Sequence, residues 1–337
     1  MTLKISINGF GRIGRLVARA IIESGRDDIE LVGINDPGGN FFPLLKYDSI
    51  HGRAPFEVEK KCEDYIYIDG KRIKRFRNRD PKNIDWGEVD TDIVFECTGK
   101  FCDREGASLH LASGAKKVLI SAPGKDEDLT VVYGVNHDAL KGEHKIVSNA
   151  SCTTNCLAPV AHVLNEAIGI EKGFMTTIHA YTGDQNTVDA SHKDPYRARA
   201  AAVNMIPTST GAAKAVGKVL PALNGKLDGV SIRVPTPNVS LVDLTFDAAK
   251  DTSVEEINAA MIAAAEGELN GVLAVNSDPT VSSDFNHDPH SSIFDLNGTK
   301  VIDGRFVRIA AWYDNEWGFS CRMIDTALRM HELGYDS

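Results

Sequence analysis

The amino-acid sequence predicts a two-domain α/β fold, in which a doubly wound parallel sheet is followed by an α+β unit on a mixed, largely antiparallel sheet. The first observation is that short apolar runs alternate with helical patterns over about the first 150 residues. The second is that longer, alternating apolar runs follow. The third is the length, since 337 residues exceed what one hydrophobic core usually supports.

Composition and charge restrict the class of protein. Apolar residues make up 42% and charged residues 25% of the chain, as in ordinary globular proteins. No apolar run approaches the roughly 18 residues of a membrane helix, and the start MTLKISING lacks the pattern of a signal peptide. We therefore expect a cytoplasmic protein without membrane contact. The net charge of -10 opposes strong binding to nucleic acid.

The cysteines show no framework spacing. The chain has six of them, scattered along its whole length, which favours reduced thiols over a disulfide scaffold. They are Cys62, Cys97, Cys102, Cys152, Cys156 and Cys321.

The elements of the first half follow from its apolar periodicity. Residues 3–7 alternate as a strand does, and the segment after them places Ile13, Leu16, Val17, Ala20 and Ile21 at helical spacing. Residues 29–36 form the next predicted strand, and 91–99 and 116–123 read as strands buried on both faces. The basic stretch KRIKRFRNR, residues 71–79, fits a solvated hairpin better than a phosphate-binding stripe.

The pattern changes after residue 150. Leu157, Val160, Leu164 and Ile168 share one face of a predicted helix over 151–170, and 173–185 and 229–250 read as longer strands. Between them, residues 187–221 begin as a long polar loop, which in a compact domain is usually functional, and end in a helix of small residues. The C-terminal ALRMHELGY is also predicted to be helical.

A glycine-rich turn follows the first predicted strand. Gly9, Gly11 and Gly14 spell G-x-G-x-x-G at the opening of a helix, where glycines allow a tight turn, the approach of a pyrophosphate and close helix packing. Asp36 closes the second strand, where its carboxylate can accept hydrogen bonds from an adenosine ribose and repel a 2'-phosphate. The pattern thus favours NAD. A glycine-rich turn with a helix-capping aspartate is the structural alternative.

Cys152 is the strongest candidate nucleophile. It falls at the predicted first turn of the helix over 151–170, where free N–H groups and the helix dipole lower a thiol pKa. A small cysteine that merely fits a turn is the alternative. Cys156 lies one turn further on, but C-x-x-x-C is not the spacing of zinc or dithiol motifs, so we expect a packed thiol and no metal.

His179 is the best-placed partner base among ten histidines. It ends an apolar strand beside Thr182, Asp184 and Gln185, where a polar cleft would open. A histidine satisfied within the core is the alternative.

Seven motifs together resemble phosphorylating glyceraldehyde-3-phosphate dehydrogenase, in the expected order and over almost the whole chain. They are NGFGRIGR, ASCTTNC, HAYTGDQ, RARAAA, IPTSTGAAKAVGKVLP, RVPTPNVSLVDL and WYDNEWG. The resemblance implies a Rossmann NAD-binding domain over 1–151, joined by a C-terminal helix over 318–337, a catalytic domain over 152–317, and a homotetramer.

The resemblance also implies the chemistry. Cys152 would attack the aldehyde of glyceraldehyde 3-phosphate, and His179 would act as general base while hydride passes to NAD. The hydride transfer would leave a thioester on Cys152. Inorganic phosphate would then attack this thioester and release 1,3-bisphosphoglycerate.

Further site residues are carried over by the resemblance alone. Thr182 and Arg233 would bind the substrate phosphate, and Ser151, Thr153, Arg197, Thr210 and Gly211 the attacking phosphate. The cofactor would contact the glycine turn, the residues next to that turn and several positions later in the chain. These positions are Gly9, Phe10, Gly11, Arg12, Ile13, Gly14, Asp36, Arg79, Ser121 and Asn315.

The chain departs from the family pattern at a few positions. Phe319 and Cys321 stand where many relatives have tyrosine and asparagine, and Cys97 stands where serine is common. Ala190 and Ser191 replace a bulkier Leu-Pro pair and resemble relatives that accept NADPH, as do the two glycines in NDPGGN. We therefore expect NAD as the main cofactor with NADP as a possible second.

Two alternative functions remain open. Erythrose-4-phosphate dehydrogenase is a sister family with the same thiol and cofactor, but the motifs PTSTGAAKAVG and RVPTPNVS favour the glyceraldehyde enzyme. A noncatalytic dinucleotide- or RNA-binding protein is disfavoured by the full set of cysteine, histidine and arginine and by the acidic charge.

Overall fold

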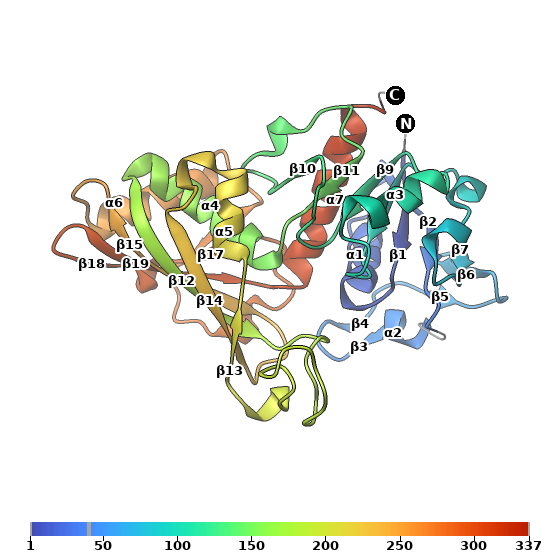
Figure 1. Ribbon diagram of the computed structural model, residues 1–337, viewed down its shortest axis with the longest axis horizontal. Coiled ribbons are helices and arrows are strands. Elements are labelled where there is room, and N and C mark those ends of the chain that lie inside the picture. Colours follow the sequence, from blue (N-terminus) through green and yellow to red (C-terminus); the bar gives the residue numbers. More distant parts are fainter. Residues whose placement is uncertain (1, 39–41, 336–337) are drawn as a thin grey trace. The chain divides into compact units, whose positions relative to one another are not determined.

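The computed structural model describes residues 2–38 and 42–335 and divides into two compact units (Figure 1). Unit 1 comprises residues 1–131, 137–150 and 320–337, and unit 2 comprises residues 132–136 and 151–319. Gly39, one of the two glycines after Asp36, lies outside the described residues. None of the described helices has the length and apolar character needed to span a membrane.

Unit 1 is built on a nine-stranded sheet in the order β10-β11-β9-β8-β1-β2-β7-β6-β5. Six adjacent pairs, from β10 through to β7, are parallel, and the hairpin strands β6 and β5 are antiparallel. The predicted parallel, doubly wound sheet is therefore confirmed. Its strands are β1 (Leu3–Asn8), β2 (Ile29–Asn35), β5 (Val58–Glu59), β6 (Tyr65–Ile68), β7 (Lys71–Phe76), β8 (Ile93–Glu96), β9 (Lys117–Ile120), β10 (Leu129–Thr130) and β11 (Ile146–Ser148).

The helices of unit 1 pack on this sheet through their apolar faces. In α1 (Arg12–Glu23) four of the five predicted positions, Leu16, Val17, Ala20 and Ile21, are buried, and the fifth, Ile13, is half-buried. Helix α3 (Arg104–Ala112) follows β8 and contacts β9. The short helix α2 (Phe42–Lys46) leads into a two-stranded hairpin of β3 (Tyr47–Asp48) and β4 (Gly52–Arg53).

The basic stretch of residues 71–79 supplies β7, one strand of the predicted hairpin, but β7 also pairs with β2, and Ile73, Arg75 and Phe76 are buried, so the hairpin is only partly solvated. β6 and β7 pair antiparallel across the turn, and Arg77 forms ion pairs with Glu63 and Asp64. Lys74 pairs with Glu88. Neighbouring carboxylates thus offset much of the positive charge.

Unit 2 contains a mixed, eight-stranded sheet in the order β13-β14-β12-β15-β19-β17-β16, with β18 paired to β19. Most pairs are antiparallel, but β12 runs parallel to β14, and β16 runs parallel to β17. Its strands are β12 (Ile170–Ala180), β13 (Ile206–Ser209), β14 (Leu227–Val234), β15 (Ser240–Ala248), β16 (Leu273–Asn276), β17 (Ser292–Asp295), β18 (Lys300–Ile302) and β19 (Phe306–Tyr313).

Helix α4 (Cys152–Ala167) contacts two other helices of unit 2, α5 (Ala212–Val219) and α6 (Val254–Glu266). The predicted strand over 229–250 is instead two strands, β14 and β15, because Pro235 and Pro237 remove backbone donors at the turn between them. Helix α7 (Trp317–Glu332) starts ten residues before the predicted ALRMHELGY, and its residues from Ser320 onward belong to unit 1.

The glycine turn after β1 depends on close backbone contact. A Cβ atom at Gly14 would lie 2.1 Å from the carbonyl oxygen of Gly9, so only glycine lets α1 approach β1 this closely. A Cβ at Gly11 would meet no atom within 4 Å, and its φ of -71° suits any residue. Gly14 is therefore needed for the packing of α1 against β1, whereas Gly11 leaves open space beside the start of the helix.

We predict that Gly14→Ala destabilises the ligand-free protein by about 1–3 kcal/mol, because the added methyl overpacks the helix against the strand. Gly11→Ala is the matched control and should change stability by less than about 0.5 kcal/mol. Urea unfolding of both variants checks this. Equal midpoints for the two variants would contradict the proposed difference in packing.

Candidate active site

Cys152 is the first residue of α4, as predicted. The preceding Ser151 has extended backbone geometry and caps the helix, since its Oγ accepts a hydrogen bond from the backbone N–H of Thr154 at 3.1 Å. Ala150 adopts a left-handed φ of 57°, which is unusual for a residue with a side chain and turns the chain sharply from β11 into the helix. The sulfur thus lies beside the unpaired N–H groups of a helix N-terminus.

His179 lies next to this cysteine. Its Nε2 is 3.5 Å from the Cys152 sulfur, and its Nδ1 is 2.6 Å from the backbone oxygen of Ala180. Arg233 Nη1, which can only donate, also lies 3.2 Å from Nδ1, but the contact with the Ala180 oxygen is much shorter. A carbonyl oxygen only accepts, so we assign the proton of the neutral ring to Nδ1, which leaves Nε2 able to take the thiol proton. The structure therefore brings together the two predicted catalytic side chains.

Burial sets the charge of this pair. It raises the pKa of the Cys152 thiol, against the opposing effects of Arg233 and of hydrogen bonds from Thr153. Burial, together with the positive charge of Arg233 as a smaller cause, lowers the pKa of His179 to about 3. The helix N-terminus alone thus does not lower the thiol pKa as the sequence suggested, and both groups are neutral in the isolated chain.

Arg233 lies on the strand beside His179. Because β12 and β14 are parallel, His179 and Arg233 are direct neighbours in register. The guanidinium Nη1 donates to the Ala180 oxygen at 3.1 Å and reaches Thr182 Oγ1 at 3.4 Å. Arg233 and Thr182, which the resemblance assigns to one phosphate, are therefore adjacent, and next to the catalytic pair.

Tyr313 is a residue of this site that sequence reasoning missed. It is buried, and its hydroxyl is 2.9 Å from both Thr153 Oγ1 and Thr177 Oγ1. Its ring meets His179 edge-on, with centroids 6.0 Å apart. Its place in the motif WYDNEWG was the only sequence signal, because its partners lie far away in the chain.

The residues expected to hold the attacking phosphate are less closely grouped. Arg197 pairs with Asp184 at 2.5 Å, although its charge still reaches His179. Thr210 and Gly211 form the turn between β13 and α5, where Thr210 Oγ1 accepts from the Ala212 N–H at 3.2 Å. No hydrogen bond joins these two residues to Cys152 or His179 in the described part of the chain.

Cys156 and Cys97 fit packing roles. Cys156 is fully buried, with its sulfur 3.4 Å from Ser292 Oγ, and burial raises its pKa to about 12. Burial likewise raises the pKa of Cys97 to about 12. Both thiols therefore stay protonated near neutral pH.

Unit 1 carries the residues expected around the phosphates of a dinucleotide. Helix α1 begins at Arg12 without a side-chain cap, so its first N–H groups and the positive end of its dipole are directed outward at Gly11. Phe10 is buried, and Ile13 is half-buried. The open space at Gly11 and the uncapped helix fit a bound pyrophosphate.

Arg12 is held by a carboxylate that the sequence did not reveal. Its guanidinium bonds both oxygens of Asp48, at 2.5 and 3.3 Å, and Asp48 also accepts from the N–H groups of Ile50 and His51 at 2.9 Å. Burial raises the pKa of Asp48, but the donors from Arg12, His51 and Ile50 outweigh it and bring the pKa from 3.8 down to about 2.

The remaining cofactor candidates are distributed over both units. Asp36 follows β2 and accepts from the Gly38 N–H at 3.0 Å, Ser121 follows β9, and Arg79 is exposed beyond β7. Asn315 belongs to unit 2, where its Oδ1 accepts a hydrogen bond from Ser240 Oγ at 2.7 Å. That bond leaves the amide nitrogen of Asn315 to act as the donor.

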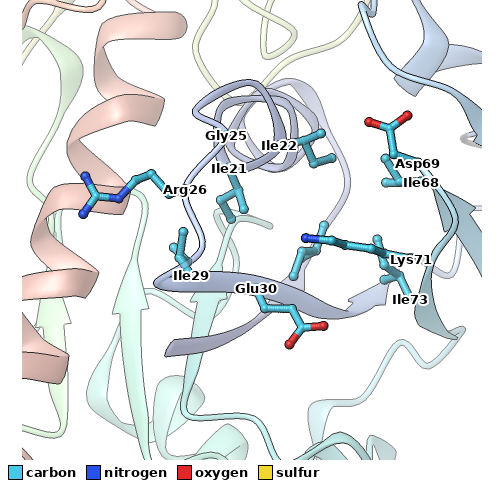
Figure 2. A pocket seen from close by; sticks show the side chains of 11 residues that line it. Ile21, Ile22, Gly25, Arg26, Ile29, Glu30, Ile68, Asp69, Lys71 and Ile73 are labelled. Carbon is cyan, nitrogen blue, oxygen red and sulfur yellow. The ribbon is translucent and has the colours of Figure 1, made fainter. Parts of the chain in front are cut away.

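A separate cavity of about 150 Å³ lies at the opposite, amino-terminal edge of the parallel strands in unit 1 (Figure 2). Isoleucine side chains from α1, β2 and the β6–β7 hairpin form its apolar wall, and Arg26, Glu30, Asp69 and Lys71 lie around it. Because the glycine turn lies at the carboxyl edge, this cavity is not part of the dinucleotide cradle.

Comparison with known proteins decides the family. Residues 3–104 match the family described as glyceraldehyde 3-phosphate dehydrogenase, NAD binding domain, and residues 151–315 match its C-terminal domain. The chain is 63% identical over 336 residues to a glyceraldehyde-3-phosphate dehydrogenase of Xanthobacter flavus, covering 99% of this chain and 100% of that protein. The chain belongs to the glyceraldehyde-3-phosphate dehydrogenase family.

Other members of the glyceraldehyde-3-phosphate dehydrogenase family are similarly close. The chain is 62% identical to the enzyme of Cereibacter sphaeroides over 335 residues, which are 99% of this chain and 100% of the relative. It is 54% identical to that of Geobacillus stearothermophilus over 337 residues, with the same coverage. The predicted family, the NAD-binding Rossmann domain and NAD as cofactor are confirmed.

We predict that Asp48→Asn lowers the free energy of unfolding at pH 7 by about 1–2 kcal/mol. The pKa of Asp48 is lower in the folded chain, so its stabilisation is complete above the unfolded value near 3.8 and is lost as the pH falls towards 2. Urea midpoints should therefore separate wild type from Asp48→Asn at pH 5–7 and converge below pH 4.

The control for this prediction is Asp28→Asn, which breaks an exposed pair with Arg26 and should change stability by less than about 0.5 kcal/mol. A difference between wild type and Asp48→Asn that stays constant down to pH 3 would show that the Asp48 charge does not cause it.

Proposed function

We propose that this chain oxidises and phosphorylates D-glyceraldehyde 3-phosphate to 1,3-bisphosphoglycerate through a thioester on Cys152, with NAD as hydride acceptor. The observation that carries the proposal is the 3.5 Å contact between the Cys152 sulfur and His179 Nε2, with Arg233 beside it. It is supported by family membership over nearly the whole chain.

The proton of the thiol moves first in this mechanism. His179 Nε2 takes it as the Cys152 sulfur attacks the aldehyde carbon, and the ring then returns a proton to the new hydroxyl of the thiohemiacetal. The backbone N–H of Cys152 would help to hold the negative charge that develops on the oxygen. The fixed Nδ1 contact with Ala180 keeps Nε2 turned towards the sulfur.

The oxidation step needs a base again. His179 removes the hydroxyl proton while the carbon loses hydride, which leaves a thioester on Cys152. NAD, when bound, supplies the hydride acceptor. A phosphate oxygen then attacks the thioester carbon, and the sulfur leaves as a thiolate that His179 can reprotonate.

Two sets of side chains and backbone groups would position the substrate phosphate and the attacking inorganic phosphate. Arg233 and Thr182 would hold the substrate phosphate, since they adjoin the catalytic pair. Ser151, Thr153, Arg197, Thr210 and Gly211 would hold the attacking inorganic phosphate, and Arg197 would exchange its pair with Asp184 for that anion.

We also infer a homotetramer in the cytoplasm. Several large apolar side chains of unit 2 are strongly exposed in the single chain, and covering them favours self-association. They include Phe174 at 51%, Val203 at 76%, Met205 at 76% and Val230 at 40%. The loop that carries Ser191 belongs to the same segment as Val203 and Met205.

NADH absorbance with glyceraldehyde 3-phosphate and NAD tests the main proposal. We predict sustained turnover only with inorganic phosphate, and without it a burst near one NADH per active site, because the thioester then accumulates. Cys152→Ala should abolish both signals while NAD binding persists. Sustained turnover without phosphate would contradict the mechanism, and faster turnover of erythrose 4-phosphate would reassign the substrate.

A second prediction concerns NADP. Ser191 is exposed, and we propose that its hydroxyl meets the 2'-phosphate bound by a neighbouring subunit. We expect kcat/KM for NADP to be lower than for NAD by less than four decades, or about 5.5 kcal/mol. Ser191→Ala should lower the NADP value alone, and an equal loss with both cofactors would contradict this role.

A further inference from the structure

Two ionisable side chains in unit 1, Glu96 and His110, are completely buried and have no part in the proposed chemistry. Glu96 Oε2 lies 2.9 Å from His110 Nε2. A charged carboxylate in a protein interior is costly unless donors surround it, so its presence calls for a physical explanation.

Glu96 lies in a row of polar side chains at the carboxyl edge of the sheet. Asn8, Asn35 and Glu96 are the last residues of β1, β2 and β8, and Asn8 stands between the other two in register. Asn35 Nδ2 donates to Asn8 Oδ1 at 2.7 Å, and Asn8 Nδ2 donates to Glu96 Oε2 at 2.6 Å. The carboxyl edge is where ligands bind in sheets of this kind.

Backbone groups fix which side-chain atoms donate and which accept hydrogen bonds along this row. The N–H of Asn78 donates to Asn35 Oδ1 at 2.9 Å, and the carbonyl of Asn78 accepts from Asn35 Nδ2 at 2.9 Å. Asn35 therefore cannot flip its amide, and Asn8 must offer its oxygen to Asn35 and its nitrogen to Glu96. The position next to Asn8 thus requires an acceptor.

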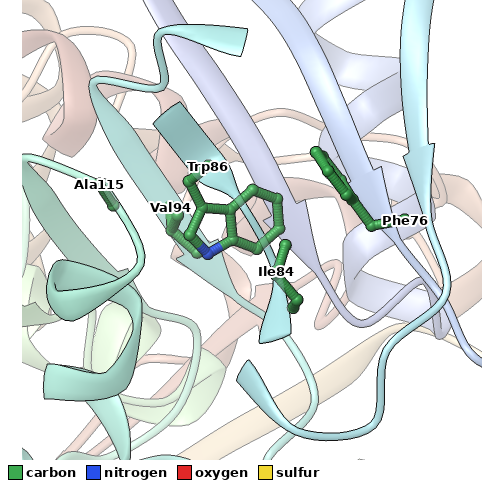
Figure 3. Packing of buried hydrophobic residues seen from close by; sticks show 5 residues of the cluster. All are labelled: Phe76, Ile84, Trp86, Val94 and Ala115. Atoms are coloured by element: carbon green, nitrogen blue, oxygen red, sulfur yellow. The ribbon is translucent and has the colours of Figure 1, made fainter. Parts of the chain in front are cut away.

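Trp86 likewise fixes the ring orientation and the proton position of His110. Its indole packs in an apolar cluster with Phe76, Ile84, Val94 and Ala115 (Figure 3), and Nε1–H donates to His110 Nδ1 at 3.1 Å. An indole nitrogen only donates, so Nδ1 accepts and the ring proton lies on Nε2, facing Glu96.

The other oxygen of Glu96 faces the glycine turn. Oε1 accepts from the backbone N–H of Thr98 at 2.8 Å and from the Thr98 hydroxyl. Four donors thus surround the carboxylate, which matches the four lone-pair positions of an ionised group. Only a carboxylate satisfies all four, because glutamine would turn an N–H₂ group towards two donors.

Thr98 connects this carboxylate to the phosphate cradle. A Cβ atom at Gly9 would lie 2.7 Å from both the nitrogen and Cγ2 of Thr98, so the backbone of the turn rests directly on this residue. The N–H of Cys97 also donates to the Asn8 carbonyl at 2.8 Å. Any shift of residues 97–98 would therefore move Gly9, which begins the turn.

We propose that Glu96 is a positioning residue for cofactor binding, acting through Asn8 and Thr98 on the Gly9 turn without contacting the dinucleotide. The inference rests on the proposed function only in that NAD is the ligand of this turn. Its ionised side chain fixes residues from β1 and the β8–α3 segment in one arrangement, so the N–H groups around Gly11 are preorganised for a pyrophosphate.

The test is Glu96→Gln, studied as the full-length protein. We expect the NAD dissociation constant, measured by calorimetry, to rise about 10-fold, which is about 1.4 kcal/mol. KM for NAD should rise by a similar factor, while kcat at saturating NAD and the rate of Cys152 alkylation stay within about twofold. An unchanged NAD dissociation constant in the folded variant would overturn the proposal.

Ile68→Ala is the control for a purely structural effect. Ile68 is buried in unit 1 and lines the cavity at the amino-terminal edge (Figure 2), so its loss should lower the melting temperature without changing NAD affinity. If Ile68→Ala weakens NAD binding as much as Glu96→Gln does, general destabilisation is the cause and the proposal fails.

Thr98→Val keeps the test informative if Glu96→Gln does not fold. It removes the hydroxyl donor but keeps the shape, and we expect NAD affinity to fall about threefold; no effect of Thr98→Val would overturn the proposed route. Where Glu96→Gln does fold, the two effects should be less than additive in the double variant, and full additivity would also overturn the route. Wild-type protein that fails to bind NAD would instead refute the proposed function itself.

Discussion

The short contact between Cys152 and His179 depends on where one helix begins. Ala150 turns the chain through a left-handed conformation, Ser151 caps the first turn, and Cys152 is then the first helical residue. One residue of slippage would rotate the sulfur by about 100° around the helix axis and away from the imidazole. The local geometry of three residues therefore controls whether a nucleophile and its base can meet.

Parallel pairing of β12 and β14 supplies the second half of this arrangement. It sets His179 beside Arg233, and the Tyr313 hydroxyl bonds to both Thr153 and Thr177. These contacts fix the strand that carries the base relative to the helix that carries the sulfur. Rigid elements hold such a pair more precisely than loops do.

The sequence predicted those features of the fold and the site that depend on residues close together in the chain. The glycine turn, the start of α4 at Cys152, the buried face of α1 and the polar end of β12 could all be predicted, because each depends on neighbours within about ten residues. The partners of Arg12 and Arg197, and the position of Tyr313, could not, since they come from contacts between segments whose pairing no periodicity encodes. Asp48 and Glu96 are ordinary acidic residues in the sequence and gain their importance only through those contacts, and the pairing of Asp184 with Arg197 was likewise not encoded in the motif that contains Asp184.

Charge balance links substrate binding to the chemistry in the proposed mechanism. Burial is the main cause of the low pKa of His179, and the positive charge of Arg233 adds to it. A substrate phosphate bound to Arg233 would offset that charge, so the pKa of His179 would rise and the ring would become a better base. The imidazole would therefore accept a proton most readily when the aldehyde is in place, and the thiol would stay protonated and less reactive towards other electrophiles until then.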